Sequence, residues 1–216
     1  MQEIDLNNSP RKKTYDWFKT FKNPTYGLNV TMDITKLIKH VKETKESFFI
    51  DMLYIVVKGL NSVPEMRMRF VDDKPVIFSD INPAITVMTK SEIFENVRFE
   101  NKETFKEFYA TAKKYIDEAK EETALTEGNY NDAVWNEYYI TCLPWLTTTA
   151  LTHPIPEDLS SQTVPRICWS KYYEENGTYK ISLNITVSHI FVDGWHLSKA
   201  FNNIQELLNN AENILK

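Results

Sequence analysis

Residues 179–188 carry the clearest pattern in the chain, an unbroken alternation of apolar and polar side chains. Apolar residues occupy the odd positions and polar residues the even ones, which is the period of a β-strand with one buried face. A second pattern follows closely, because apolar residues between Leu197 and Leu208 recur with helical spacing. The end of the chain is therefore predicted to be a half-buried strand, a short connection over 189–196 and a helix.

The rest of the chain predicts further strands and helices. Helices are predicted at 34–41 with Asp33 as the N-cap, at 47–63 up to Pro64, and at 103–122. Strands are predicted at 28–33, 67–71, 75–79, 85–89, 137–143 and 166–173, turns at 72–74 and 176–177, and a polar loop around Gly128. Strands interleaved with helices in this way indicate an α/β layered fold. No repeat, linker or change of composition divides the chain, so we expect a single domain over residues 1–216.

Glycine is scarce, and its distribution excludes two common nucleotide sites. The 216 residues include only five glycines, scattered singly. Both the G-x-G-x-x-G loop and the P-loop need several glycines close together, so that backbone N–H groups can reach a phosphate. A formal net charge of −5 and a pI of about 5.5 argue against a nucleic-acid partner. A nucleotide bound by this chain is therefore expected to be held without a glycine cradle.

Secretion and membrane insertion are not indicated by the sequence. The first 13 residues are polar and lack the apolar region of a signal peptide. The most apolar run, 48–60, contains Asp51 and Lys58 and is too short to span a bilayer. Cys142 and Cys168 are the only cysteines, too few for a disulfide framework. We therefore expect a cytoplasmic protein without a membrane partner.

Candidate chemistry is concentrated between the last predicted strand and the last predicted helix. Parity along the strand places His189 on the same face as Val187, which is predicted to be buried, and loss of solvation keeps an imidazole neutral near pH 7. A neutral, positioned imidazole is the usual general base for a hydroxyl or a thiol. Asp193 is the expected N-cap of the last helix. Gly194 is expected to permit a sharp turn where a side chain would collide.

Other interpretations stay open from the residue pattern alone. A histidine at a strand end is often only a hydrogen-bonded core residue, and His189, Asp193 and His196 are residue types that bind metals. A strand-to-helix break inside this triplet argues against a metal site, so no metal is predicted. A serine hydrolase would need a G-x-S-x-G elbow, which the scattered glycines cannot supply. Cys142 and Cys168 fall within predicted strands and are expected to be small core residues rather than nucleophiles.

The motif His189-x-x-x-Asp193-Gly194, placed between the last strand and a C-terminal helix, resembles that of the chloramphenicol acetyltransferase family. Five further segments resemble family signatures, in the family's order and over nearly the whole chain. They are Ser9-Pro10-Arg11-Lys12 with Trp17-Phe18, Pro24-Thr25-Tyr26 with Met32-Asp33-Ile34-Thr35, Pro64-Glu65-Met66-Arg67-Met68, Ile140-Thr141-Cys142-Leu143-Pro144-Trp145, and Pro165-Arg166-Ile167-Cys168-Trp169-Ser170-Lys171-Tyr172-Tyr173. The resemblance implies a two-layer α/β sandwich, in which a mixed β-sheet is flanked by helices.

The resemblance also implies a reaction: direct transfer of an acetyl group from acetyl-CoA to a hydroxyl of chloramphenicol, and with it antibiotic resistance. In the family the motif histidine takes the proton from the hydroxyl that attacks the thioester, and His189 matches it. The family's aspartate pairs with an N-terminal arginine, matched by Asp193 and Arg11, although such a pair can also serve geometry alone. Thr141 matches a serine that donates a hydrogen bond to the tetrahedral oxyanion, a contact worth about 3 kcal/mol of barrier.

Binding residues and assembly follow from the same resemblance. The positions that hold the adenine and phosphate end of coenzyme A are matched by Pro144, Trp145, Lys171 and Tyr172. From the sequence alone, the two aromatic residues of this set are equally well explained as core residues. Positions around the acceptor pocket are matched by Phe18, Tyr26 and Cys168. The family is a homotrimer with sites at the subunit interfaces, where the histidine faces the neighbour's pocket, so a homotrimer is expected here.

Four departures from the family pattern concern the acceptor. Ser188 replaces the first histidine of a His-His pair, Cys168 replaces a threonine, Pro24 replaces a cysteine, and His153 lies where the family has apolar pocket residues. The prediction of O-acetyl transfer does not depend on these positions, whereas the prediction of chloramphenicol as acceptor does. The alternatives are an acyltransferase of the same fold with another hydroxyl or thiol acceptor, and a non-catalytic binding protein that kept the fold.

Overall fold

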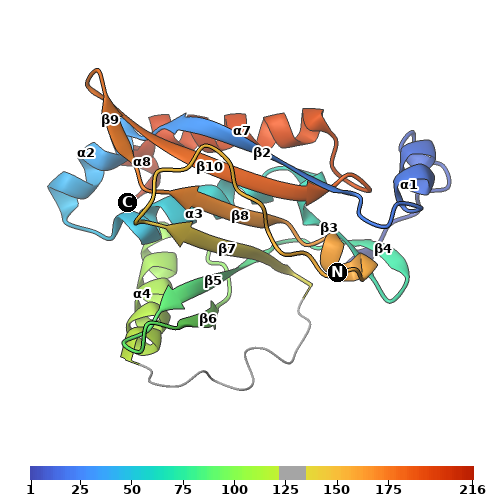
Figure 1. Ribbon diagram of the computed structural model, residues 1–216, viewed down its shortest axis with the longest axis horizontal. Coiled ribbons are helices and arrows are strands. Elements are labelled where there is room, and N and C mark those ends of the chain that lie inside the picture. Colours follow the sequence, from blue (N-terminus) through green and yellow to red (C-terminus); the bar gives the residue numbers. More distant parts are fainter. Residues whose placement is uncertain (122–134) are drawn as a thin grey trace.

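The computed structural model describes residues 1–121 and 135–216, and its centre is a seven-stranded sheet (Figure 1). The predicted loop around Gly128 and the last residue of the helix predicted at 103–122 lie outside the described residues. Six strands follow the order β2-β10-β8-β7-β5-β6, and β9 pairs with β10. The strands are β2 (Thr25–Asp33), β5 (Asn82–Met88), β6 (Phe94–Arg98), β7 (Glu137–Leu143), β8 (Arg166–Ser170), β9 (Tyr173–Glu175) and β10 (Thr178–Ser188).

The sheet is mixed, as predicted. β5, β7 and β8 are parallel neighbours, whereas β2, β8 and β9 pair with β10 in antiparallel fashion and β6 pairs with β5 in the same way. A separate small sheet consists of β1 (Gln2–Glu3), β4 (Lys74–Ile77) and β3 (Met68–Val71). The predicted hairpin between β3 and β4 is present, and its two turn residues, Asp72 and Asp73, both have positive φ angles.

Helices cover one face of the large sheet. The helices are α1 (Lys12–Phe18), α2 (Thr35–Thr44), α3 (Phe48–Asn61), α4 (Phe105–Glu121), α6 (Leu159–Gln162), α7 (Gly194–Asn209) and α8 (Ala211–Ile214), with a 3-10 helix at Pro64–Arg67. α3 contacts α2, α4 and α7 and is buried on nearly all sides, which explains its all-round apolar sequence. The predicted layered α/β architecture is thus confirmed. Within the described residues, no helix combines the length and apolar character needed to cross a membrane.

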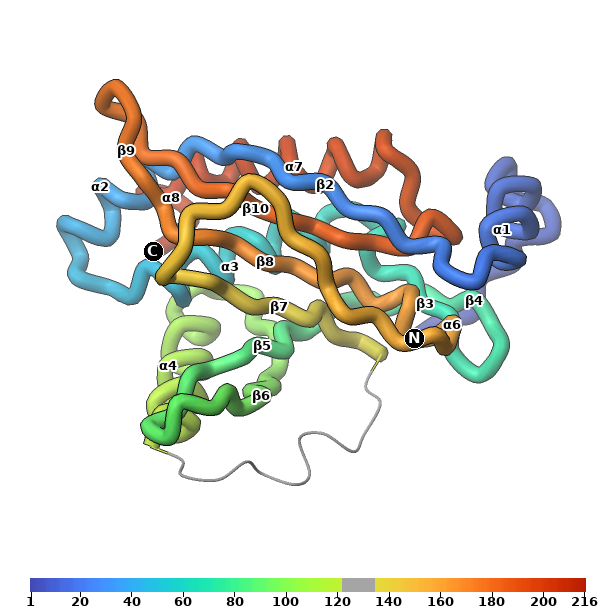
Figure 2. The backbone as a smooth tube through the Cα atoms, viewed as in Figure 1, coloured from blue at the N-terminus to red at the C-terminus, as the bar shows by residue number. Residues whose placement is uncertain are grey.

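β10 departs from the predicted half-buried strand, because both of its faces are covered. The odd-numbered residues lie in the core beneath the helices, and the even-numbered Ser182, Asn184 and Thr186 are also buried. The connection between β7 and α6 passes across this second face (Figure 2). His153 in that connection lies 3.0 Å through Nε2 from Oδ1 of Asn184, which also accepts from Oγ1 of Thr186 at 3.1 Å. The polar face of the strand is therefore a hydrogen-bonded layer rather than a solvated surface.

Other elements also differ from the sequence prediction. The N-cap of α2 is Ile34 rather than Asp33, although Oδ1 of Asp33 accepts from the backbone N–H of Thr35 at 2.9 Å. The strand predicted at 166–173 divides into β8 and β9, because the backbone N–H of Lys171 leaves the ladder and donates to Leu146 O at 2.8 Å. β6 was not predicted at all.

The pairing of β2 with β10 depends on a glycine. A Cβ at Gly27 would lie 2.4 Å from Oγ1 of Thr186, so the two strands could not approach so closely with any other residue there. The register runs from Lys180 opposite Asp33 to Ser188 opposite Thr25. This pairing brings the start of β2 beside the point where β10 ends and the predicted functional motif begins.

Candidate active site

His189 follows directly after β10 and lies between two aromatic rings. Its ring stacks on Phe18 of α1 with centroids 3.9 Å apart and an interplanar angle of 10°, and it lies 4.7 Å from the ring of Tyr26 in β2. Its backbone N–H donates to Pro24 O at 2.8 Å. The prediction of a buried imidazole is wrong, because 32% of the side chain is exposed. The strand ends at Ser188, so the alternation no longer determines where the next side chain points.

Arg11 holds the whole turn after β10. Its guanidinium binds Asp193 in bidentate fashion, Nη1 to Oδ2 at 2.7 Å and Nη2 to Oδ1 at 2.9 Å. The same group donates from Nε to Ile190 O at 3.0 Å and from Nη2 to His189 O at 3.1 Å. These hydrogen bonds from Arg11 lower the pKa of Asp193, so the carboxylate is ionised at neutral pH. The predicted pair thus fixes the backbone carbonyls of the motif histidine and of the residue after it.

Asp193 also lies close to the imidazole of His189. Its Oδ1 is 3.3 Å from Nδ1, and this nitrogen is buried without a hydrogen-bond partner in the described part of the chain. The exposed third of the histidine side chain therefore belongs to the rest of the ring, which leaves Nε2 as the nitrogen that a substrate can reach. One imidazole nitrogen thus faces a fixed carboxylate while the other faces solvent, which is the geometry expected of a general base.

Tyr26 completes the surroundings of the imidazole. Its hydroxyl donates to Val192 O at 3.2 Å. Burial, and then the negative charge of Asp193, raise the pKa of Tyr26 to about 12. The phenol therefore remains protonated, and its ring packs beside the imidazole of His189. Phe18 and Tyr26, which were predicted to contact the acceptor, are positioned in one chain to hold the ring of His189.

The metal interpretation of the motif does not fit the hydrogen bonds. Both oxygens of Asp193 already accept from Arg11. Nδ1 of His196 accepts from the backbone N–H of Asp193 at 3.1 Å, and its Nε2 lies 3.5 Å from Oε1 of Glu65. Asp193 is the N-cap residue of α7, as predicted. Two of the three side chains, those of Asp193 and His196, are thus already engaged by the protein itself.

Gly194 does not have the role that the sequence suggested. A Cβ at this position would meet no heavy atom within 4 Å in the described chain, so the predicted collision is wrong. The space beside the first residue of α7 is open. The neighbouring Trp195 is 68% exposed.

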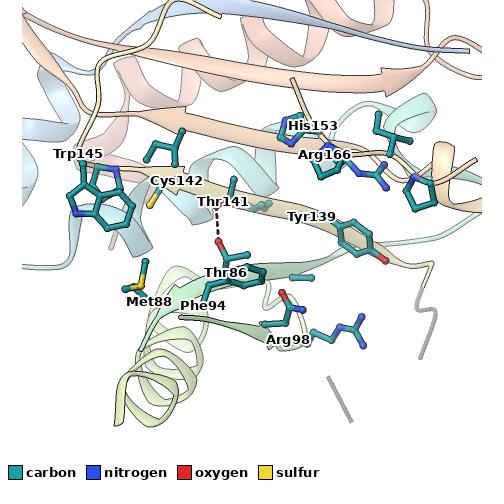
Figure 3. Close-up of a pocket in the computed structure, with 18 residues that line it drawn as sticks. Thr86, Met88, Phe94, Arg98, Tyr139, Thr141, Cys142, Trp145, His153 and Arg166 are labelled. Atoms are coloured by element: carbon teal, nitrogen blue, oxygen red, sulfur yellow. Dashed lines mark hydrogen bonds between the residues drawn. The ribbon is translucent and has the colours of Figure 1, made fainter. Parts of the chain in front are cut away.

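Thr141 lies in a cavity of about 1030 Å³ on the sheet face opposite the helices (Figure 3). Its Oγ1 is 2.7 Å from Oγ1 of Thr86, and either hydroxyl can be the donor. When Thr86 donates, the hydrogen of Thr141 is left for a ligand in the cavity. Figure 3 shows Trp145 and Cys142 on one side of this threonine pair, and Tyr139, His153 and Arg166 toward the other.

A second cavity of about 280 Å³ adjoins the first, and the two share Cys142 and Pro144. It brings together three of the four predicted coenzyme residues, Pro144, Lys171 and Tyr172, and adds Phe48 and Phe49 from the start of α3. Tyr172 and the fourth predicted residue, Trp145, are 41% and 61% exposed. The alternative that these two aromatic residues belong to the core is therefore wrong.

Cys142 and Cys168 are unsuited to nucleophilic chemistry. Burial raises the pKa of Cys142 to about 11 and that of Cys168 to about 12, so both thiols are protonated at neutral pH. Cys168 lies in β8, directly beside Thr141 in the register of the parallel pair, but it is buried and does not line either cavity.

The two halves of the predicted site lie far apart within one chain. Thr141 is in register with Cys168, and Cys168 with Asn184 of β10. His189 comes five residues after Asn184, which corresponds to about 17 Å along the strand. The histidine lines neither cavity. One chain therefore brings His189, Asp193, Arg11, Phe18 and Tyr26 together, and separately the cavity residues, but it does not join the two groups.

Sequence reasoning missed the far end of the large cavity. Phe94, Asn96 and Arg98 of β6 line it, together with Tyr139 of β7 and Arg166 at the start of β8. A short alternation was available, because Glu95 and Val97 are buried while their neighbours face the cavity. Five residues with charges on both faces give too weak a periodic signal for a strand.

Loss of the Arg11 guanidinium is expected to loosen this turn. For Arg11→Ala we expect a loss of about 1–2 kcal/mol in the free energy of unfolding at pH 7, since Asp193 is partly exposed and its hydrogen bonds are partly replaced by water. The pair lowers the folded-state pKa of Asp193, so its contribution is complete above about pH 4 and is lost as the pH falls through the lowered value. Urea unfolding at several pH values measures this. If Arg11→Ala and the unaltered chain had equal stability and equal turnover, the pair of Arg11 and Asp193 would have no role in the site.

Comparisons with known proteins identify one family of similar sequences. The family model described as chloramphenicol acetyltransferase matches residues 1–205. A chloramphenicol acetyltransferase of Campylobacter coli is 29% identical over 209 residues, 96% of this chain and 98% of that protein. One from Escherichia coli is 25% identical over 204 residues, 94% of this chain and 91% of that protein.

Solved structures show the same similarity. A chloramphenicol acetyltransferase structure superimposes with a TM-score of 0.87 at 25% identity, covering 96% of this chain and 99% of the other. The dihydrolipoamide acetyltransferase of Azotobacter vinelandii gives a TM-score of 0.70 at 16% identity over 95% of this chain and 89% of the other, which shows a shared fold alone.

Proposed function

Because the chain belongs to the chloramphenicol acetyltransferase family and is therefore an acyltransferase, we propose that it transfers an acetyl group from acetyl-CoA directly to a hydroxyl of chloramphenicol. His189 is the general base of this proposal. The observation that carries it is the imidazole clamped between Phe18 and Tyr26, with Nδ1 beside the ionised Asp193 and the opposite edge open. Such a group can accept a proton without moving.

The proposed reaction proceeds through a tetrahedral intermediate. Nε2 of His189 takes the proton of the acceptor hydroxyl as the hydroxyl oxygen attacks the carbonyl carbon of the thioester. The C–S bond then breaks, the new ester is released, and the proton passes from the imidazolium to the sulfur of coenzyme A. Asp193 stabilises the imidazolium while it exists, and Arg11 keeps Asp193 in place.

Thr141 is the proposed donor to the oxyanion of that intermediate. It lies in the large cavity, and its hydrogen bond with Thr86 holds the side chain in one orientation. A donor that is already oriented lowers the barrier because no reorganisation is needed as the charge develops.

The smaller cavity is the proposed site for the nucleotide end of coenzyme A. Tyr172 and Trp145 offer exposed aromatic faces, and Lys171 supplies a cation for phosphate. Pro144 lies where the two cavities meet, so the pantetheine arm of a coenzyme bound here would point toward Thr141. Acetyl-CoA is thus the proposed co-substrate.

We propose a homotrimer in which each active site lies between two copies of the chain. The separation of His189 from Thr141 supports this arrangement, because no single chain can bring both to one thioester. Exposed aromatic side chains lie near the motif. Trp17 and Phe21 pack on Phe18, which stacks on His189, and they are 60% and 39% exposed, while Trp195 at the start of α7 is 68% exposed. Large apolar side chains grouped in this way are typical of an interaction surface. His189 of one copy would then face the large cavity of its neighbour.

A different hydroxyl acceptor is the second candidate, and it is favoured by the polar end of the large cavity. Arg166 lines this end, and its guanidinium donates to Ser161 O and Val164 O at 3.0 Å each and lies over the ring of Tyr139. His153 and Asn96 add further polar groups. Tyr139 and Thr141 are two residues apart in β7. An acceptor would suit these side chains if it carried a hydrogen-bonding or anionic group at about that distance from its reacting hydroxyl.

A thiol-release assay tests both candidates. Purified protein with acetyl-CoA and chloramphenicol is expected to release coenzyme A at a rate that rises with chloramphenicol concentration, and the acetyl ester is expected in the product. Release of coenzyme A with other alcohols but not with chloramphenicol would show that the acceptor is a different hydroxyl compound. No release with any member of a panel of alcohols, thiols and amines would contradict the enzyme assignment.

A further inference from the structure

Three side chains that the proposed reaction does not use converge where α2 passes into α3. His40 lies in the second half of α2, Glu46 in the connection, and Asp51 in the first turn of α3. One possible ligand atom from each lies within 4.8 Å of the other two. Nε2 of His40 and Oε2 of Glu46 are 3.0 Å apart.

Asp51 makes this cluster different from an ordinary surface ion pair. Asp51 is fully buried, with 0% of its surface exposed. Neither of its carboxylate oxygens has a hydrogen-bond partner within the described residues. A carboxylate removed from water without a partner is strongly unfavourable unless it is neutralised. Either a proton or a cation is therefore needed beside Asp51.

We propose that His40, Glu46 and Asp51 bind a divalent transition-metal cation, for which Zn²⁺ is the best match. One imidazole nitrogen and two carboxylate oxygens form a ligand set that zinc accepts, with water as a fourth ligand. Tetrahedral ligands at zinc distances lie about 3.4 Å from one another, so a small contraction of the cluster is sufficient. Two carboxylates balance the charge of the cation.

The number of ligands in this cluster argues against a calcium ion, and its exposed side allows a cation to enter. Calcium requires six to eight oxygen ligands, more than these three residues provide. The side chain of Glu46 is 31% exposed, whereas that of His40 is 8% exposed, so the open side of the cluster lies at the glutamate. A cation can enter there and keep its water.

A cation at this position would connect the end of α2 to the start of α3. Phe48 and Phe49, which lie between two of the ligands in sequence, line the smaller cavity. The metal is therefore a structural element that fixes the backbone next to the proposed coenzyme site, and it takes no part in the chemistry at His189. This inference does not depend on the proposed acceptor.

Calorimetric titration of the full chain with ZnCl₂, after removal of metals with a chelator, tests the proposal. We expect one Zn²⁺ per chain at this site and a rise in Tm of about 5 °C or more at saturating zinc. Asp51→Asn keeps the size of the side chain and removes its charge, so it should weaken binding at least about tenfold and reduce the thermal shift at the same zinc concentration. Glu43→Gln changes an exposed carboxylate of α2 that pairs with Lys39, and this variant should bind zinc like the unaltered chain.

Either of two titration results would overturn the proposal: no zinc binding, or binding and thermal shift that are the same in Asp51→Asn and the unaltered chain. If Asp51→Asn fails to fold, Co²⁺ bound to the unaltered chain gives an independent measurement. The expected spectrum has d–d bands of nitrogen and oxygen ligation without a thiolate charge-transfer band. A thiolate band would assign the metal to Cys142 or Cys168 and contradict the site.

Discussion

His189→Ala is expected to lower kcat/KM for acetyl transfer by about 10³-fold, within the range that general bases contribute. The hydroxyl of the acceptor is a weak nucleophile while it keeps its proton. The imidazole of His153 also lines the large cavity, but its Nε2 is already hydrogen-bonded to Oδ1 of Asn184. The aromatic clamp of Phe18 and Tyr26 remains in the variant, so the fold is expected to persist. Steady-state rates of coenzyme A release, with unfolding measured on the same preparations, check this result.

His196→Asn is the matched control for the base. His196 lies nearby in the first turn of α7. Its Nδ1 accepts a hydrogen bond from the backbone of Asp193, and an asparagine oxygen can replace it. We expect this variant to stay within a few-fold of full activity. If His189→Ala kept its activity while His196→Asn lost it, the assignment of His189 as the general base would be wrong.

Thr141→Val has the second largest expected effect, a decrease in kcat of about 100-fold with little change in KM. Valine has nearly the same shape as threonine, so the cavity keeps its form and only the donor to the oxyanion is lost. An interaction made only in the transition state changes kcat rather than binding. Thr141→Ser keeps the hydroxyl and is expected to retain most of the activity.

Thr86→Val separates the donor from its support. Thr86 is hydrogen-bonded to Thr141 but is not the proposed donor, so we expect a smaller loss than for Thr141→Val. A rise in KM alone in Thr141→Val, without a fall in kcat, would show that the hydroxyl serves binding and not the intermediate.

The sequence predicted well those elements that local patterns determine. The strand predicted at 137–143 is β7 at Glu137–Leu143, and the all-round apolar run at 47–63 is the buried helix α3. The turn residues Asn176 and Gly177 both have positive φ angles, as their types suggest. In each case the hydrophobic period or the turn chemistry is contained within a few residues.

Features that depend on packing between distant parts of the chain were harder to predict from the sequence. The alternation in β10 identified a strand, but not that the connection between β7 and α6 would cover its polar face. The exposure of His189 depends on the residue at which the strand ends, and the open space at Gly194 depends on what surrounds it in three dimensions.

The candidate site shows the same division between local and distant information. The motif residues His189 and Asp193 and their partner Arg11 come together as predicted. Motif order alone gives no distance between His189 and Thr141, because that distance follows from the antiparallel pairing of β8 with β10. The resemblance to a trimeric family was the only sequence signal that anticipated their separation.

The central claim is that each active site takes its base from one copy of the chain and its oxyanion donor from another. Co-expression of His189→Ala with Thr141→Val in equal amounts tests it most directly. In a randomly mixed closed oligomer, about one quarter of the sites receive an intact histidine from one variant and an intact threonine from the other, one half times one half. We predict recovery to about a quarter of full activity, whereas activity no higher than the mean of the two separate variants would contradict the claim.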